Sequence, residues 1–379
     1  MRPDTGPVAA FLDPRHLEVA KAVDAFGREA LAAHDPEGDA EARAAARALV
    51  PRLAKAGLGK AVAELDLRAV ALIREGLAYR SPLADAVYAL QALGSVPIRL
   101  GGTEAQRARW LPAIDRGEVM CGFAMTEPDA GSDVGAMATR ATRDGDGWVL
   151  EGRKAFISNA GIADLYTVFA VTDPGKGAKG ISAFVVPADA PGLRFAGAQV
   201  LSAPHPLGEL AFDRCRIPAD HLLGEPGKGL GLGLATLDRL RATVGAAACG
   251  MAARALDEAV AHVKARVQFG KPLAEQQLTQ DRLAAMATEL HAARLLVYRA
   301  VWAKDGGAER VTLESAMAKS YATEAAQRIV DGAVQLQGGR GVLASSVVDH
   351  LYRAVRSLRI YEGTTEIQRL LIAKDLLGA

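Results

Sequence analysis

The sequence predicts an α+β protein with a helical domain at residues 1–117, a β domain at 118–222 and a second helical domain at 223–379. Three observations predict this order. Apolar residues recur at helical spacing in the first and last blocks. Short segments rich in Val, Phe, Tyr and Ile, separated by Gly, Pro and Asp, fill the middle block. A length of 379 residues also favours two or three domains over one.

In the first block, apolar spacing and helix-start residues indicate a packed helical bundle. Apolar residues recur at spacings compatible with one helix face at Leu17, Val23, Phe26, Leu49, Leu53 and Leu58. Ser81 before Pro82 predicts an N-cap and a first helical turn. Thr103 with Gln106 three residues later predicts a capping box.

The middle block has the features of an antiparallel sheet or a small β-barrel. Strands are expected at Trp148–Leu150, Ala155–Ser158, Leu165–Val171 and Ile181–Val186. Turn-forming residues separate them at Asp144–Gly147, Asp173–Gly177 and Pro191–Gly192.

A glycine-rich stretch, Gly224–Gly233, is expected to be a hinge before the last block. Its Gly227–Gly233 segment (GKGLGLG) matches neither the P-loop nor the dinucleotide-binding glycine pattern. Beyond it, helical periodicity continues to the end of the chain. One apolar stripe consists of Leu283, Met286, Leu290, Val297 and Val301.

Composition excludes several classes of function. Lys plus Arg number 45 against 44 for Asp plus Glu, so the net charge of +1 gives no overall positive field for nucleic acid or an anionic membrane. The seven histidines include no H-x-x-x-H pair, and no metal site is expected. Aromatic residues make up only 5%, so Ala, Leu and Val must form most of the core.

Cysteine usage and hydropathy predict a cytoplasmic location. Cys121, Cys215 and Cys249 form no C-x-x-C pair, so neither a disulfide framework nor a zinc cluster is expected. Residues 1–14 contain no apolar signal-peptide core. The uncharged run at 242–253 is too short to span a bilayer, so no membrane association is expected.

Two stretches need a chemical explanation. The first is Ala124–Ala136 (AMTEPDAGSDVGA), followed by Gly152–Gly161 (GRKAFISNAG). Its small residues, hydroxyls and glycines can bring backbone N–H groups close to a flat, polar ligand. The second is Gln335–Gly341 (QLQGGRG), followed by Arg359–Arg369 (RIYEGTTEIQR).

Glu362 is a lone carboxylate in the second stretch, between a tyrosine and an expected helix start. Such a residue is either a surface group or a partly buried base, and residue chemistry alone favours a structural role. Thr365 with Gln368 is expected to cap the terminal helix.

These stretches resemble the two most characteristic motifs of the acyl-CoA dehydrogenase family of flavoproteins. The resemblance covers nearly the whole chain, because Arg266–Leu273 (RVQFGKPL), Leu237–Arg241 (LDRLR) and the helical–β–helical order also match. It implies a C-terminal four-helix bundle after the β domain. It also implies a homotetramer with FAD bound between subunits.

The resemblance implies FAD-dependent α,β-dehydrogenation of an acyl-CoA thioester, with electrons passing to an electron-transfer flavoprotein. By position, Glu362 resembles the base that removes the α-proton while the β-hydrogen leaves as hydride to flavin N5. An exposed Glu has a pKa of about 4.3, so desolvation by the acyl chain and flavin is needed to raise its basicity. The enolate oxygen is expected to accept hydrogen bonds from the Glu362 backbone N–H and a ribityl hydroxyl. Some relatives carry the base where this chain has Leu240, which cannot accept a proton.

Other residues resemble the family's cofactor contacts. Those expected beside the flavin ring are Phe123, Met125, Thr126, Phe156 and Ser158. Phe156 and Ser158 replace the family's frequent Trp and Thr, and they keep the aromatic face and the hydroxyl. Those expected at the FAD pyrophosphate and adenosine across a subunit interface are Arg266, Gln268, Phe269, Gln277, Gln335, Gly338 and Gly339. Thr364 and Glu366 complete the contacts, although Phe269 could also be plain interface core and Glu366 a helix-start charge.

The residues that resemble substrate contacts are Ser132, Asp238, Arg241 and Gly363. Because the net charge is only +1, the anionic CoA must be bound by local groups such as Arg241. The floor of the acyl pocket is expected around Tyr88–Leu93.

Three departures from the family pattern leave alternatives open. Gly57–Val62 (GLGKAV) stands where the family has P-x-x-x-G-G-x-G, Ser202–Gly208 (SAPHPLG) replaces K-x-G-x-R-x-S, and Arg353 precedes Ala354 instead of Asp. The first two lie near regions that shape the acyl pocket and the CoA entrance. The alternatives are a relative acting on a carrier-protein-bound or otherwise atypical thioester, a flavin oxidase, and a catalytically silent assembly partner. Retention of Glu362 and the flavin-lining hydroxyls disfavours the silent partner.

Overall fold

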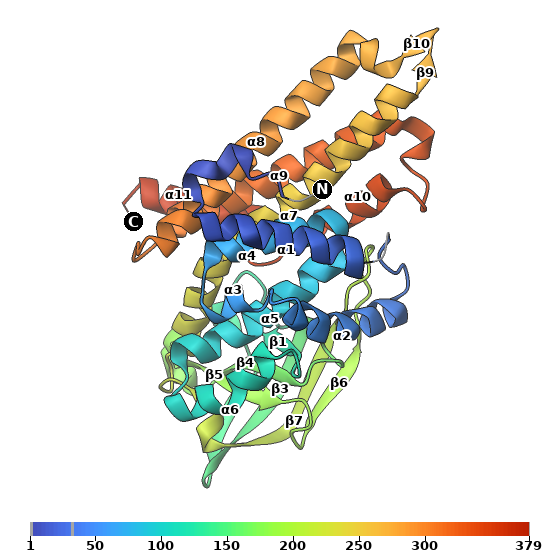
Figure 1. Ribbon diagram of the computed structural model, residues 1–379. Coiled ribbons are helices and arrows are strands. Elements are labelled where there is room, and N and C mark those ends of the chain that lie inside the picture. The colour runs from blue at the N-terminus through green and yellow to red at the C-terminus, as the bar shows by residue number, and fades with distance from the viewer. Residues whose placement is uncertain (1–2, 32–33, 379) are drawn as a thin grey trace. The chain divides into compact units, whose positions relative to one another are not determined.

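The structure is a computed structural model that describes residues 3–31 and 34–378 (Figure 1). Helices, then strands, then helices follow one another along the chain, as predicted. The chain forms two compact units. The first unit comprises Met1–Asp35, Glu64–Asp85 and Asp238–Ala379, and the second comprises Pro36–Ala63 and Ala86–Leu237. The domain boundaries expected at 117/118 and 222/223 stay predictions.

The second unit contains the sheet. Its strands are β1 (Cys121–Ala124), β2 (Arg140–Asp144), β3 (Gly147–Ser158), β4 (Leu165–Val171), β5 (Ile181–Pro187), β6 (Leu193–Ala198), β7 (Leu207–Pro218) and β8 (Leu222–Leu223). Their order is β6-β7-β3-β2-β4-β5-β8, with β1 beside β4. Most neighbours are antiparallel, but β1 pairs with β4 in parallel, and β2 meets β4 in parallel at Arg140 and Val171. The sheet is therefore mixed.

Two expected strands prove to be one. Trp148–Leu150 and Ala155–Ser158 both belong to β3, whose pairing with β7 shifts register after Leu150 and again after Lys154. Gly152 lies at the first shift with φ 146°, and a Cβ there would approach Thr139 Oγ1 to 2.5 Å. A side chain at this position would disrupt the close packing, which explains the glycine.

The helices of the second unit are α2 (Asp39–Lys55), α3 (Lys60–Ala63), α6 (Glu104–Asp115) and most of α5 (Pro82–Gly101). Short 3-10 turns occur at Val134–Ala136, Pro174–Gly180 and Ala219–His221. The expected capping box of α6 is confirmed, because Thr103 Oγ1 accepts from Gln106 N at 3.2 Å and Gln106 Oε1 accepts from Thr103 N at 2.8 Å. Ser81 also caps α5, with Oγ accepting from Ala84 N at 2.9 Å.

The expected glycine hinge is only partly correct. Helix α7 spans Gly229–Ala265, so the glycines from Gly229 onward are helical. A Cβ at Gly229 would approach the Ser182 carbonyl carbon to 2.1 Å, and one at Gly233 would approach Met125 Cε to 2.5 Å. These glycines therefore let the start of α7 pack closely against β5 and Met125 within the second unit.

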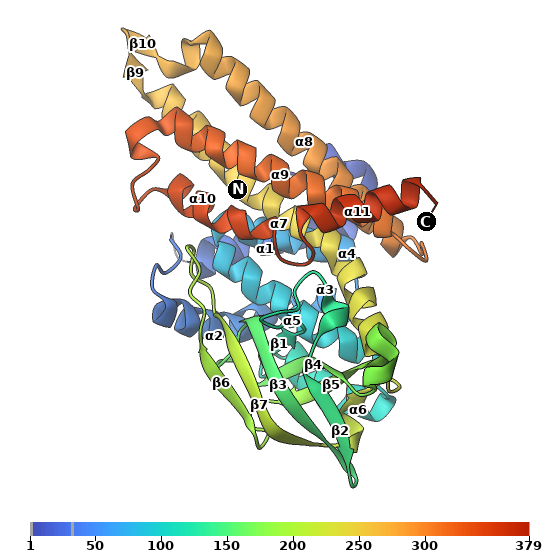
Figure 2. The ribbon, with the colours of Figure 1, turned by 180° about the vertical axis from the view of Figure 1, so that it is seen from behind.

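The first unit is helical apart from a short hairpin. It contains a 3-10 turn at Gly6–Phe11, α1 (Pro14–Ala30), α4 (Leu67–Arg80), α7 from Asp238 onward, β9 (Val267–Gln268), β10 (Lys271–Pro272), a 3-10 turn at Leu273–Glu275, α8 (Gln277–Asp305), α9 (Thr312–Gln337), a 3-10 turn at Gly338–Arg340, α10 (Val347–Leu358) and α11 (Thr365–Leu376). Helix α9 packs against α8, α10 and α11 (Figure 2).

Small residues allow the helices of the first unit to pack closely. A Cβ at Gly250 on α7 would approach Glu75 O on α4 to 2.1 Å. A Cβ at Gly245 would approach Val297 Cγ2 on α8 to 2.6 Å. The buried alanines of α9 include Ala316, Ala318, Ala322, Ala325, Ala326 and Ala333. The core is therefore rich in alanine, as composition predicts.

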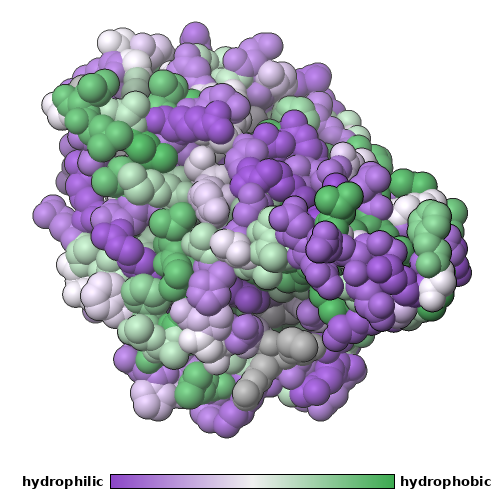
Figure 3. Space-filling model, turned by 90° about the horizontal axis from the view of Figure 1, so that it is seen from above, coloured by the Kyte–Doolittle hydropathy of each residue, from purple (hydrophilic) through white to green (hydrophobic). Residues whose placement is uncertain are grey.

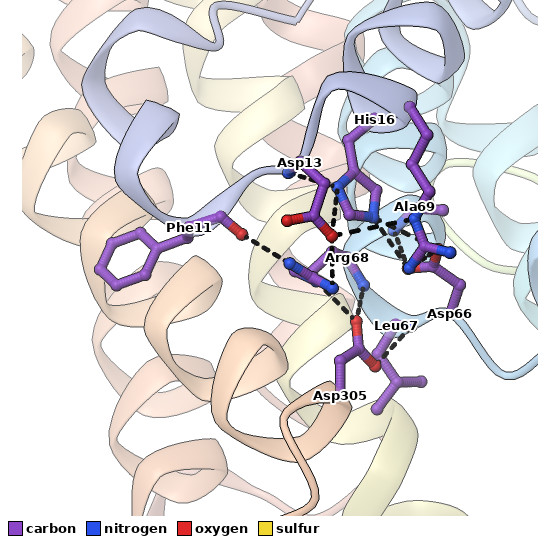
Figure 4. Close-up of polar contacts among 9 residues, drawn as sticks. Phe11, Asp13, His16, Asp66, Leu67, Arg68, Ala69 and Asp305 are labelled. Atoms are coloured by element: carbon purple, nitrogen blue, oxygen red, sulfur yellow. Dashed lines mark hydrogen bonds and ion pairs between the residues drawn. The ribbon is translucent and has the colours of Figure 1, made fainter.

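The start of α4 is fixed by carboxylates from two sources (Figure 4). Asp66 is its N-cap and accepts from Ala69 N at 3.1 Å. Asp305, the last residue of α8, accepts from the backbone N–H groups of Leu67 and Arg68, both at 3.0 Å. Backbone N–H groups of a first helical turn have no partner within the helix, so these carboxylates supply one. The arrangement joins α4 to the end of α8.

The three cysteines are free and buried. Among the described helices, none combines the length and the apolar character needed to cross a membrane.

Candidate active site

Glu362 lies in the turn between α10 and α11 in a left-handed backbone conformation. Its φ is 53°, and that of Gly363 is 90°. A left-handed conformation is uncommon for a residue other than glycine and persists only where surrounding contacts hold it. Thr364 follows as the N-cap of α11, with Oγ1 accepting from Ile367 N at 3.3 Å. The expected cap at Thr365 is wrong by one residue, because Thr365 is already helical.

One carboxylate oxygen of Glu362, Oε2, is buried and has no hydrogen-bond partner among the described residues. Burial raises the pKa of Glu362 above its ordinary value, although the charges of Arg74 and Lys319 oppose this shift. A desolvated carboxylate without a partner is a stronger proton acceptor than an exposed one.

Charged residues from four helices surround Glu362. Arg74 of α4, Lys319 of α9 and Arg241 of α7 favour its ionised form, whereas Asp85 of α5 disfavours it. Arg74 is itself paired, with Nε 2.8 Å from Asp85 Oδ1 and Nη2 3.0 Å from Asp85 Oδ2. Of these four residues only Arg241 was expected, from the family resemblance, because the other three lie on helix faces that otherwise look like ordinary core.

Arg241 is a buried guanidinium with unused donors. It is 6% exposed, and its Nε and Nη1 have no hydrogen-bond partner among the described residues. Asp238 Oδ1 lies 3.6 Å from Nη1 and also makes no hydrogen bond. Burial lowers the pKa of Arg241, and the charges of Asp238 and Glu362 oppose that shift. Buried donors without partners cost free energy, so the pair is suited to a polar ligand.

The residues expected beside the flavin ring come together in the second unit. Phe123 lies on β1, Met125 and Thr126 follow it, and Phe156 and Ser158 lie on β3. Ala155 N donates to Thr126 O at 3.0 Å, which joins the two segments. The Phe156 side chain is 58% exposed, on a left-handed backbone with φ 55°. An exposed ring beside two hydroxyl-bearing residues fits a flat, polar cofactor.

A buried ion pair beneath these segments was not predicted. Lys154 is 0% exposed, and its Nζ lies 2.7 Å from Glu127 Oε1 and 3.0 Å from Met125 O. Glu127 also accepts from Ala138 N at 2.6 Å and from Thr139 N at 3.0 Å. Burial lowers the pKa of Lys154 to about 8, although Glu127 opposes the shift.

The unusual stretch at Ser202–Gly208 contacts the same segment. His205 Nε2 lies 3.2 Å from Ser158 Oγ. Gln199 Oε1 accepts from Phe156 N at 2.6 Å. Burial lowers the pKa of His205 to about 4, and the charge of Arg43 adds to the effect. The departure of this stretch from the family pattern was the signal that could have identified His205.

The remaining expected cofactor residues lie on the surface of the first unit. Arg266, Gln268 and Phe269 belong to the β9–β10 hairpin, whereas Gln335, Gly338 and Gly339 lie at the end of α9. All six are exposed, as is Gln277, and Phe269 is 96% exposed. Figures 1 and 2 show the hairpin far from α11, at whose start lie Thr364 and Glu366. Within the first unit, the expected cofactor residues of the hairpin therefore lie far from Thr364 and Glu366.

Several large hydrophobic side chains are exposed in and just after the hairpin, and just after the 3-10 turn that follows α9. They include Val267, Phe269, Leu278, Val342 and Leu343. The face drawn in Figure 3 carries hydrophobic residues scattered among hydrophilic ones.

Two other expectations are placed by the structure of the second unit. Ser132 is exposed, in the connection between β1 and β2. Tyr88, expected near the acyl-pocket floor, is 2% exposed and donates from its hydroxyl to Leu58 O at 3.2 Å. It lines a cavity of about 30 Å³ together with Gln91 and Ser95.

Comparisons with known proteins agree with this architecture. Three family models match: the acyl-CoA dehydrogenase N-terminal domain at residues 13–118, the middle domain at 122–215 and the C-terminal domain at 227–377. The chain is 38% identical over 374 residues to the probable acyl-CoA dehydrogenase FadE25 of Mycobacterium tuberculosis, covering 97% of this chain and 96% of that one.

It is also 39% identical over 378 residues to the mitochondrial short-chain specific acyl-CoA dehydrogenase of Rattus norvegicus, covering 98% of this chain and 86% of that one. Among solved structures, butyryl-CoA dehydrogenase from Megasphaera elsdenii is similar with a TM-score of 0.90 and 33% identity, covering 97% of this chain and 99% of that one. The expected fold, with helical, sheet and helical domains in that order, is confirmed.

Proposed function

We propose that this chain, which belongs to the acyl-CoA dehydrogenase family, removes the α-proton of an acyl-CoA thioester with Glu362 in an FAD-dependent α,β-dehydrogenation. The observation that carries the proposal is the buried Oε2 of Glu362, which has no hydrogen-bond partner among the described residues. An unpartnered buried carboxylate oxygen lowers the stability of the fold, and such groups are typical of functional sites. The product is the trans-2-enoyl thioester.

Glu362 and Arg241 have complementary tasks in this reaction. The α-proton of a thioester is a weak acid, so its pKa lies far above that of an exposed carboxyl group. Burial raises the pKa of Glu362 and so reduces the pKa difference between the proton donor and the base. The proton passes to the Glu362 carboxylate. Arg241 offers Nε and Nη1 to polar groups of the substrate, with Asp238 beside it. Ser132 and Gly363 complete the proposed substrate contacts.

The second unit offers a surface suited to the flavin ring of FAD. Phe156 provides an exposed aromatic face, and the Thr126 and Ser158 side chains provide hydroxyls on joined segments. Phe123 and Met125 are proposed as neighbouring flavin contacts in and after β1, the segment that Thr126 O joins to β3. When bound, FAD supplies the oxidant that accepts the β-hydride at N5. An electron-transfer flavoprotein is the proposed acceptor of the two electrons.

A homotetramer with FAD shared between subunits is part of the proposal. The hairpin and the end of α9 present exposed guanidinium and amide groups, which suit a pyrophosphate. Added Cβ atoms at Gly338 and Gly339 would meet nothing within 4 Å, so the backbone there is open to a ligand. Thr364 and Glu366 are proposed as the remaining contacts.

The decisive experiment is anaerobic titration of the FAD-loaded protein with butyryl-CoA and longer acyl-CoAs, followed by the loss of visible flavin absorbance. Glu362→Gln should keep bound FAD but slow the loss by several orders of magnitude. Glu18→Gln is the control, because Glu18 is an exposed residue paired with Lys21. A wild-type rate in Glu362→Gln would show that another group is the base.

The same preparation distinguishes the alternative functions. Failure to bind FAD would support a silent assembly partner. Loss of absorbance only with carrier-protein-bound acyl groups would support an atypical thioester substrate. Rapid reoxidation by oxygen, in preference to an electron-transfer flavoprotein, would support an oxidase.

A further inference from the structure

Lys319 of α9 is a fully buried lysine beside the turn that carries Glu362. It is 0% exposed, and its Nζ donates to Gly363 O at 2.7 Å. Burying an ammonium group is costly, and lysine is rarely buried without a partner. Burial accordingly lowers the pKa of Lys319 to about 8, while the negative charge of Glu362 opposes the shift. The ammonium group of Lys319 therefore lies at the Gly363 carbonyl, one residue after Glu362.

The Gly363 carbonyl is held from two sides. Gln368 of α11 donates from Nε2 to Gly363 O at 2.9 Å and to Glu362 O at 3.4 Å. With Lys319, two side-chain donors from different helices therefore converge on this turn. Glu362 and Gly363 are consecutive left-handed residues, so outside contacts are required to keep the backbone in this conformation.

A second set of contacts from α9 fixes the two sides of the same turn. Glu324 Oε1 accepts from Arg359 Nε at 2.9 Å and from Thr365 Oγ1 at 2.9 Å. Thr365 N donates to Arg359 O at 3.1 Å, which closes the turn. These contacts hold Arg359 and Thr365, the two ends of the turn. The hydrogen bond from Lys319 instead holds Gly363 in its centre, next to Glu362.

We propose that Lys319 is a positioning residue for catalysis: its bond to the Gly363 carbonyl sets the left-handed backbone that directs Glu362, and its positive charge stabilises the carboxylate. The inference rests on the proposed function, because it assigns a task relative to Glu362 as the base. Neither the family motifs nor the charge pattern of the sequence indicates this residue.

The electrostatic consequence has a definite sign. The charged groups that act on Glu362 are Arg74, Lys319 and Arg241, which lower its pKa, and Asp85, which raises it. Removal of the Lys319 charge therefore raises the pKa of Glu362. Proton abstraction requires the carboxylate, so the acid limb of the rate profile moves to higher pH. A nearby opposite charge shifts a pKa by roughly 1–3 units, and we take a shift of about half a unit as the smallest one that supports the proposal. Burial also raises the pKa of the neighbouring Tyr361 hydroxyl, which stays neutral across this range.

The test measures the rate of flavin reduction by a saturating acyl-CoA as a function of pH in FAD-loaded protein. Lys319→Met should lower the plateau about tenfold or more and move the acid limb upward by at least about half a pH unit. Lys319→Arg keeps the charge, so its acid limb should stay near that of wild type while its plateau recovers partly. Thr323→Val is the matched control: Thr323 is buried on the same helix, and its hydroxyl donates to the backbone carbonyls of Lys319 and Ser320 on that helix.

Two results with Lys319→Met would overturn the proposal. One is a Lys319→Met profile within twofold of wild type at the plateau with an unmoved acid limb. The other is an equal fall in Lys319→Met and Thr323→Val without a shift of the limb, which is what general loosening of α9 would produce. If Lys319→Met does not fold, Gln368→Met tests the same carbonyl without removing charge. It should lower the plateau at least threefold and leave the limb in place, and an unchanged plateau would overturn the proposal.

Glu362→Gln separates this inference from the proposed function. If that variant reduces flavin at the wild-type rate, the assignment of the base fails, and the role of Lys319 fails with it. If Glu362→Gln is inactive but Lys319→Met behaves as wild type, only the role of Lys319 is wrong.

Discussion

Loss of the buried ammonium of Lys154 should destabilise the second unit and weaken flavin binding together. Lys154 Nζ donates to Met125 O and pairs with Glu127 Oε1, so it joins β3 to the segment that follows β1. Lys154→Met keeps most of the side-chain volume and removes only the charge and its hydrogen bonds. The change leaves the Glu127 carboxylate buried without its counter-ion.

The cost can be worked out from the contacts that remain. Removing one partner of a buried ion pair typically costs about 3–5 kcal/mol. After Lys154→Met, Glu127 still accepts from Ala138 N and Thr139 N, so we expect the lower end, about 3 kcal/mol. After Glu127→Gln, the amide oxygen can still accept a hydrogen bond from the ammonium, but the ammonium loses its counter-ion, and the amide nitrogen faces the donor Ala138 N. We therefore expect the upper end, about 5 kcal/mol.

The assay is urea unfolding followed by tryptophan fluorescence in a Trp302→Phe background. The two remaining tryptophans, Trp110 and Trp148, both lie in the second unit, so the signal reports on that unit. The double variant Lys154→Met/Glu127→Gln should cost clearly less than the sum of the single variants, because it leaves no unpaired buried charge. FAD affinity, measured by equilibrium titration, should fall in Lys154→Met, since Met125 is part of the proposed flavin surface.

This reasoning would be refuted if each single variant lay within 1 kcal/mol of the background protein or if the two costs simply added. An unchanged FAD affinity in a clearly destabilised Lys154→Met protein would refute the link to the flavin surface while leaving the ion pair intact.

Two further predictions concern the first unit. Burial raises the pKa of Asp66, but hydrogen bonds from His16 and Ala69 N outweigh it and lower the pKa to about 2 from 3.8. A lowered folded-state pKa stabilises the fold above the unfolded value, so the destabilisation by Asp66→Asn should be roughly 2 kcal/mol near neutral pH and should vanish as the pH falls from about 4 to 2 in acid unfolding curves. A difference that stays constant over that range would contradict the assignment. Arg241→Met should raise KM for acyl-CoA about tenfold or more, because hydrogen bonds to a charged group contribute about 1.5–3 kcal/mol each, and an unchanged KM would remove Arg241 from the substrate site.

Local signals explain which parts of the fold the residue pattern could predict. The capping box at Thr103 and the N-cap at Ser81 are both present, because a cap depends on residues three positions apart. The parallel pairing of β1 with β4 gave no such signal, since partner choice is a property of the whole sheet. The prediction of a hinge at the glycines that start α7 was partly wrong for a related reason. Glycine serves flexibility and close packing equally well, and only the neighbouring atoms distinguish the two.

The residues of the candidate site show the same contrast between local signals and tertiary contacts. Glu362, Arg241 and the flavin-lining residues belong to short motifs, so the resemblance indicated them directly. Lys154, Arg74 and the other buried charges act through tertiary contacts between residues distant in sequence. In the linear sequence, Lys319 on the alanine-rich helix α9 cannot be distinguished from a solvent-exposed lysine. Its burial follows from the packing of the neighbouring helices, which no local pattern encodes.

The balance of charges around Glu362 explains why burial prevails there. Three cations favour its ionised form, which alone would make the carboxylate a weak base. Asp85 offsets one of them, because it is paired with Arg74 through two hydrogen bonds. Lys319 directs its ammonium to the Gly363 carbonyl, and Arg241 keeps donors free for a ligand. Burial is nevertheless the largest influence on this carboxyl group, so the pKa of Glu362 stays above its ordinary value. In the proposed dehydrogenation, charged groups of the site face the polar thioester while the Glu362 carboxylate remains basic enough to accept the α-proton.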